Sequence, residues 1–160
     1  MKSPRLASVF GAIAALAIAG CTTTQPAAAE TSPYAGVYAG SYTCGDGEHG
    51  FYLDLSSVTA ASGGGFEASG VLGFYPTLSG VGGSSGGVAG SFRVSGTISA
   101  AGDVALTAGE WLKQPPGYGA ANLEGKLRER PAGGYALMGK PVVPGMPDAC
   151  SNLIATQFLP

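Results

Sequence analysis

The sequence contains few of the side chains that catalysis and metal binding commonly use. Charged residues make up only 11% of its 160 residues, and there is a single histidine, whereas soluble domains carry about 25% charged residues. The three cysteines form no Cys-x-x-Cys pair, and one histidine cannot supply a His-Glu-x-x-His motif. We therefore expect neither an enzyme nor a bound metal or cofactor, because spaced sets of zinc ligands are missing.

Basic residues and long apolar runs are also scarce. Eight lysines and arginines stand against ten aspartates and glutamates, which gives a net charge of −2. Such a weakly charged, mildly acidic chain lacks the basic surface that phosphate backbones require, so we expect no nucleic-acid partner. No later segment has the roughly 20 consecutive apolar residues that a membrane-spanning helix needs. At 45% hydrophobic residues, however, the chain is too apolar to be disordered throughout.

The N-terminus resembles the signal of a bacterial lipoprotein. Two basic residues precede an apolar run from Leu6 to Ala19, which is too short to span a membrane and fits a signal helix. Ile18-Ala19-Gly20-Cys21 then has the small residues and the cysteine of a lipobox. The resemblance implies cleavage before Cys21, acylation of Cys21 and, since Thr22 is not an aspartate, anchoring at the periplasmic face of the outer membrane. An ordinary secretory signal that is cut near residues 27–29 is the alternative.

Three regions follow from this interpretation. Residues 1–20 are predicted to be the signal peptide, and residues 21–33 the lipidated cysteine with a flexible tether. The tether is rich in Thr, Ala and Pro and has no apolar periodicity. Residues 34–160 are predicted to form a single all-β domain, which the Cys21 lipid would hold at the membrane.

Two cysteines remain for the domain, one near each of its ends. An exported protein meets an oxidising compartment, where disulfides form and persist. We therefore predict a disulfide between Cys44 and Cys150. A metal site or a catalytic thiol is the alternative.

The domain shows the alternation and the glycine-rich turns of short β-strands. Eight segments are predicted as strands: 37–44, 51–58, 66–75, 91–99, 104–108, 122–130, 134–140 and 151–158. Their short connections predict about eight antiparallel strands in a small up-and-down barrel, with a β-sandwich as the alternative. Gly70, Gly96 and Gly125 fall on inward positions, where glycine allows a strand to bend strongly. The Gly- and Ser-rich segment 79–90 is predicted to be a flexible loop.

Trp111 and Tyr118 flank a stiff Pro-Pro pair and are the first candidates for a contact site. Exposed Trp and Tyr are favoured at binding surfaces. The alternative is that Trp111 closes one end of the barrel as part of the core.

Two groups of ionisable residues are weaker candidates. Lys126, Arg128 and Arg130 lie on one face of a predicted strand and form a basic stripe that could meet an anionic envelope polymer. A solvated strand face is the default interpretation. Asp46, Glu48 and His49 lie close together in the sequence, but Asp-Gly is a strong turn signal, so a polar hairpin turn is expected there.

Several spaced motifs are similar to those of an uncharacterised small all-β domain of exported bacterial proteins. They are Tyr34-x-Gly36-x-x-x-Gly40-x-Tyr42-x-Cys44, Trp111-x-x-x-Pro115-Pro116-Gly117-Tyr118, Leu123-x-Gly125 and Cys150-x-x-Leu153. The resemblance implies one disulfide-linked domain and carries no activity. The chain departs from that pattern in its Gly- and Ser-rich loop and in Asp-Gly-Glu-His after the first domain cysteine.

The favoured function is therefore a non-catalytic lipoprotein that binds an envelope component or another protein, as the lysozyme-inhibitor lipoproteins of similar size do. A calycin-like carrier of a small apolar ligand is the second hypothesis, and an envelope hydrolase is disfavoured by the few ionisable groups. A carrier needs an apolar cavity of about 300 Å³ or more. Because many Phe and Leu residues are predicted to face inward, we expect a filled interior.

Overall fold

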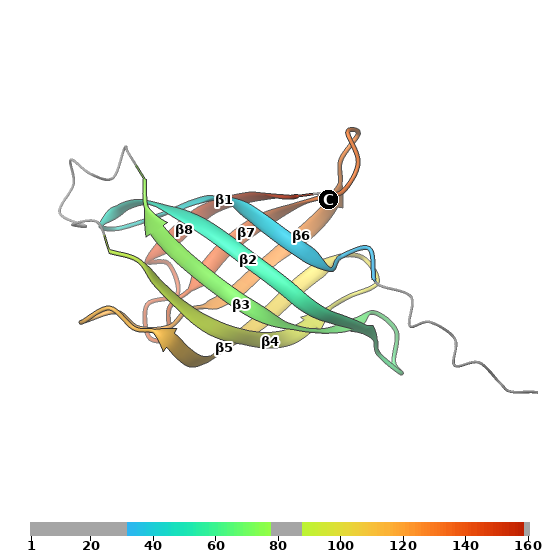
Figure 1. Cartoon of the computed structure of the whole chain (residues 1–160), viewed down its shortest axis with the longest axis horizontal. Coiled ribbons are helices and arrows are strands. Elements are labelled where there is room, and N and C mark those ends of the chain that lie inside the picture. Colours follow the sequence, from blue (N-terminus) through green and yellow to red (C-terminus); the bar gives the residue numbers. More distant parts are fainter. Residues whose placement is uncertain (1–31, 78–87, 159–160) are drawn as a thin grey trace, which may run out of the picture.

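The computed structural model describes residues 32–77 and 88–158, which form a closed antiparallel barrel (Figure 1). The strands are β1 (Gly36–Cys44), β2 (Gly47–Ala60), β3 (Phe66–Pro76), β4 (Gly90–Ile98), β5 (Asp103–Lys113), β6 (Asn122–Glu129), β7 (Tyr135–Val142) and β8 (Cys150–Gln157). Each strand pairs with the next along the chain, and β8 pairs with β1 to close the barrel. The prediction of an eight-stranded up-and-down barrel is confirmed, and the β-sandwich is excluded.

Three predicted features lie outside the described residues. They are the signal peptide, the lipidated Cys21 with nearly all of its tether, and most of the Gly- and Ser-rich loop. None of the described residues forms a helix that is long and apolar enough to span a lipid bilayer.

The barrel interior is built from the inward half of each alternating strand. On β2 the alternation buries the side chains of Phe51, Leu53 and Leu55, and they face Leu72 and its neighbours on β3. The same alternation buries the remaining core side chains, which include Phe92, Val94, Ile98, Val104, Leu106, Leu123, Leu127, Leu137 and Leu153. Such burial of apolar area is the main favourable contribution to folding.

Two of the inward glycines sit where strands approach each other closely. A Cβ atom on Gly70 would collide with the carbonyl oxygen of Asp54, and one on Gly96 with that of Ala105. A β-bulge in β2 begins directly after Asp54, and bulges bend a strand locally. Glycine is therefore required at these two inward positions, where a side chain would collide with the neighbouring strand.

Two strands, β2 and β5, are each about six residues longer than predicted. The hairpin between β1 and β2 uses only Gly45 and Asp46 as its turn, so that His49 belongs to β2 and not to a wide polar turn. Strand β5 continues past residue 108 to Lys113. Register shifts against β4 interrupt the inward–outward alternation in this part of β5 and turn Trp111 toward Phe92. The hairpin predicted at the Asp-Gly pair is therefore confirmed but narrower than expected, and the predicted end of the fifth strand is corrected.

One end of the barrel is closed by aromatic rings. The ring of Tyr34 meets Phe66 at 5.2 Å and Tyr135 at 4.8 Å, both edge to face. The buried Gln157 amide donates a hydrogen bond of 2.8 Å to the carbonyl oxygen of Ala35 and accepts one of 3.1 Å from the Tyr135 backbone. The first and last described residues both lie at this closed end, because β1 begins and β8 ends there.

Candidate functional site

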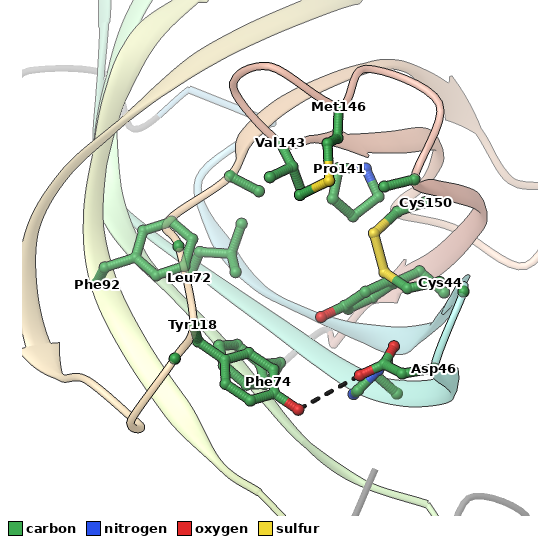
Figure 2. A pocket seen from close by; sticks show the side chains of 17 residues that line it. Cys44, Asp46, Leu72, Phe74, Phe92, Tyr118, Pro141, Val143, Met146 and Cys150 are labelled. Carbon is green, nitrogen blue, oxygen red and sulfur yellow. Dashed lines mark hydrogen bonds and ion pairs between the residues drawn. A yellow bond between two sulfur atoms is a disulfide. The ribbon is translucent and has the colours of Figure 1, made fainter. Parts of the chain in front are cut away.

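The opposite end of the barrel contains an open pocket of about 400 Å³ (Figure 2). It is lined by side chains from β1 to β4, by the connection between β5 and β6, and by the loop between β7 and β8. The lining residues are Tyr42, Cys44, Gly45, Asp46, His49, Leu72, Phe74, Phe92, Gly117, Tyr118, Gly119, Ala121, Pro141, Val143, Met146, Ala149 and Cys150. The predicted filled interior is thus found along most of the barrel but not at this end.

A pair of stacked rings forms one wall of the pocket. Tyr118 lies against Phe74 with the ring centroids 5.6 Å apart and the planes inclined by 22°. The backbone of Tyr118 is fixed by a hydrogen bond from its amide to the Pro115 carbonyl and by another from the Gln114 side chain to its own carbonyl. The connection between β5 and β6 is therefore folded back over the open end.

The strand pairing explains why there is room for this connection. Strands β5 and β6 pair over only four residues of each strand, from Asp103 to Leu106 on β5. Beyond Leu106, β5 follows β4 alone, and the Asn122 side chain accepts a hydrogen bond from the Ala108 amide. The two strands diverge toward the open end, so the chain between them can supply a wall of the pocket.

The floor and the second wall are apolar. Leu72 and Phe92 face each other across β3 and β4 and close the pocket toward the core. On the other side, Pro141, Val143 and Met146 line it, as Figure 2 shows. Pockets with mainly apolar walls and a few placed polar groups are typical of small-molecule sites.

The polar groups of the pocket gather around Asp46. Its Oδ1 lies 2.9 Å from His49 Nε2, and the Tyr118 hydroxyl donates a hydrogen bond of 3.3 Å to its Oδ2. The His49 side chain is 5% exposed and that of Asp46 is 39% exposed. His49 is also stacked on the Tyr42 ring, 5.3 Å away. The carboxylate is thus held at the pocket wall by two partners while part of it remains open to solvent.

The surroundings of Asp46, Tyr42 and Tyr118 shift the pKa of each side chain. Partial burial opposes ionisation of Asp46, but the hydrogen bond and the charge of His49, together with the Tyr118 hydroxyl, leave the pKa of Asp46 below its ordinary value. Burial and the nearby Asp46 charge raise the pKa of Tyr42 and that of Tyr118 above the usual tyrosine value. The site therefore presents one carboxylate and two neutral phenol groups near neutral pH.

The predicted disulfide between Cys44 and Cys150 is confirmed and lies in the pocket wall (Figure 2). It joins the end of β1 to the start of β8, which are the first and last strands of the barrel. Cys44, Asp46 and His49 place donor atoms within 4.8 Å of one another. With Cys44 in the disulfide, only two of these three side chains are left as ligands, fewer than zinc sites use.

The structure brings Trp111 and Tyr118 together through the phenylalanines of the pocket. Trp111 is partly buried and lies 5.0 Å from Phe92 and 6.4 Å from Phe74, edge to face in both cases. Tyr118 lines the pocket itself, whereas Trp111 supports the rings behind it. The predicted contact residues therefore meet at one place, but only Tyr118 faces the cavity.

The basic stripe lies apart from the pocket. Lys126 pairs with Asp103 across β5 and β6, with 2.6 Å between Nζ and Oδ1, and Arg128 is exposed further along β6. Arg130 follows the end of β6, toward the closed end of the barrel. None of these three side chains lines the pocket.

Sequence reasoning did not identify Tyr42 and Phe74 as site residues. Both fall within predicted strands, and the structure buries both side chains. The available signal was that each is the last large inward-facing residue before its strand ends. Such residues face the mouth of a barrel rather than its centre.

Comparison of the chain with protein-family models, with curated proteins and with solved structures finds no match.

Proposed function

We propose that this protein is an exported, lipid-anchored carrier that binds a small, largely apolar ligand in the pocket at the open end of its barrel. The observation that carries the proposal is the pocket itself. Its volume of about 400 Å³ exceeds the roughly 300 Å³ that a carrier of this kind needs. Its floor and one wall consist of apolar side chains, and polar groups are confined to the region around Asp46.

The position of the chain ends supports a tethered arrangement. The described chain begins at the closed end of the barrel, opposite the pocket. An outer-membrane lipid anchor at Cys21 would therefore attach on the side away from the pocket. A ligand could enter and leave without passing the point of attachment.

A neutral apolar fluorophore, N-phenyl-1-naphthylamine, tests the proposal. We expect saturable binding of one probe per chain, weakened in Ala121→Phe because the added ring occupies the pocket. Ala105→Phe makes the same substitution at an exposed position of β5 and should leave binding unchanged. Absence of saturable binding, or equal binding by both variants, would contradict a carrier function.

Binding of an envelope protein or polymer at the same end is the second candidate. Leu112 is 49% exposed and Met146 is 59% exposed, and both lie on segments next to the pocket mouth. Exposed large apolar side chains beside a cavity are common at protein contacts. Capture of a partner by the unchanged protein, lost in a Leu112→Asp variant that still binds the fluorophore, would support this function instead, because Leu112 does not line the pocket.

A further inference from the structure

Among the described residues, the pocket is lined by one carboxylate and by no lysine or arginine. Its ionisable lining residues are Tyr42, Asp46, His49 and Tyr118, and no lysine or arginine is among the residues that line it. The lysine on the nearby end of β7, Lys140, is bonded to Asp148 and does not belong to the lining. A ligand in the pocket therefore meets the Asp46 carboxylate, and His49 is the one described lining side chain that can carry a positive charge.

The carboxylate of Asp46 retains the capacity to bind a ligand. An ionised carboxylate offers about four lone-pair positions, and the structure shows one hydrogen bond to each of its oxygens, from His49 and from Tyr118. Its side chain lines the pocket and is partly exposed. The two existing hydrogen bonds hold the carboxylate in one orientation, so that it loses little conformational entropy when a donor on the ligand binds.

Aromatic faces surround this carboxylate. His49 and Tyr118 are bonded to Asp46, and each is stacked on a further ring, His49 on Tyr42 and Tyr118 on Phe74. The Tyr42 hydroxyl makes no hydrogen bond to any other described residue, although the ring is largely buried and lines the pocket. Aromatic faces attract cations, and a hydroxyl oxygen accepts a hydrogen bond from an ammonium group.

We propose that the pocket selects hydrophobic amines, whose ammonium group is bound by Asp46 and the adjoining Tyr42 and Tyr118 rings while the apolar part rests on Leu72, Phe92 and Val143. The inference rests on the proposed carrier function and names the class of ligand. A carboxylate ligand such as a fatty acid is disfavoured in the same pocket, because its charge would be desolvated near Asp46 with no lysine or arginine to pair with it, and His49 already pairs with Asp46.

Three naphthalene derivatives of the same shape test the selection: 2-(1-naphthyl)ethylamine, 2-(1-naphthyl)ethanol and 1-naphthylacetate. Their dissociation constants are measured by calorimetry at pH 8 with the purified full-length protein, and Ala121→Phe in the same buffer gives the background of unspecific partition. We expect the amine to bind about tenfold or more tightly than the alcohol, a difference of about 1.4 kcal/mol. The carboxylate should bind least.

Two variants test whether the charge of Asp46, rather than an effect on folding, causes the preference for the amine. Asp46→Asn should reduce the affinity for the amine to that for the alcohol and leave the alcohol affinity within about twofold. Asp103→Asn removes an equal charge at the other end of the barrel, where the residue pairs with Lys126, and should preserve the preference for the amine. If Asp46→Asn fails to fold, the order of the three affinities in the unchanged protein still decides.

The outcomes distinguish the two levels of the proposal. Binding of the alcohol and the amine with equal affinity, or tightest binding of the carboxylate, would overturn the selection of amines and leave the carrier function in place. Absence of binding by all three compounds and by the neutral fluorophore would overturn the carrier function itself. A preference for the amine that persists in Asp46→Asn would also overturn the assignment, because the charge would then act from elsewhere.

Discussion

Trp111 lies edge-on to Phe92, with 5.0 Å between the ring centroids and 69° between the planes. The two residues are paired across β4 and β5 at a register shift, and without that shift the alternation of β5 would point Trp111 outward. Phe92 in turn forms part of the pocket floor. The only tryptophan of the chain therefore supports the candidate site from behind.

Replacing Trp111 with alanine is expected to lower the stability of the barrel and the affinity of the pocket together. Truncation of a fully buried Trp costs about 3–5 kcal/mol, and because Trp111 is only partly buried we expect about 1–3 kcal/mol. Urea denaturation measures the loss. Leu112→Ala, at the exposed neighbouring position, is the control and should change the free energy of unfolding by less than about 0.5 kcal/mol. An unchanged free energy of unfolding in Trp111→Ala would mean that the ring is a free contact residue, as the first interpretation of the sequence has it.

In the exported form that we propose, the disulfide is expected to be complete. Cys44 and Cys150 are separated by 106 positions in the sequence, and a crosslink across so long a loop restricts the unfolded chain strongly. Reduction or a Cys44→Ala and Cys150→Ala double variant should cost about 2–4 kcal/mol of stability. Thiol labelling of the denatured, unreduced protein should modify neither cysteine, and full labelling of both would exclude the crosslink in the exported protein.

Acid is expected to remove the stabilisation that Asp46 contributes. Because the pKa of Asp46 is lower in the folded protein than its ordinary value, the contribution is complete above that ordinary value and is lost as the pH falls through the folded one. The stability difference between the unchanged protein and Asp46→Asn should therefore shrink below about pH 4. We expect a difference of no more than about 1 kcal/mol at neutral pH, the scale of a partly exposed pair. A difference that is constant from pH 2 to pH 6, measured by thermal melts, would argue against this role.

Cys21→Ser tests the membrane anchor. If the N-terminus is a lipoprotein signal, the variant cannot be acylated and should accumulate as unprocessed precursor or be released from the membrane fraction. Fractionation of envelopes followed by mass determination measures both. Mature-sized Cys21→Ser protein that remains bound to membranes would contradict the lipoprotein assignment.

The strands were predictable because their inward and outward residues alternate. Phe51, Leu53 and Leu55 show the pattern, and the structure buries all three. The end of β5 was not predictable in this way. A register shift places Trp111 inward where simple alternation would place Glu110, and such an irregularity depends on the neighbouring strand β4.

The pocket depends on relationships between segments that are distant in the sequence. Tyr118, Phe74 and Asp46 come together only because β5 and β6 diverge and the chain between them folds back over the barrel mouth. Tyr118 and the cluster around His49 were recognised separately, and no local pattern linked them. The disulfide was predictable, since only two cysteines remained for the domain once Cys21 was assigned to the lipid anchor.

An NMR titration with N-phenyl-1-naphthylamine is the most direct test of the carrier function. Amide resonances of the ¹⁵N-labelled protein report the place of binding residue by residue. We expect saturable shifts at Asp46, Tyr118 and Val143 around the open end, and none at Tyr34 and Tyr135 at the closed end. Shifts confined to the closed end or to the outer faces of the strands, or no saturable shifts, would contradict ligand binding in this pocket.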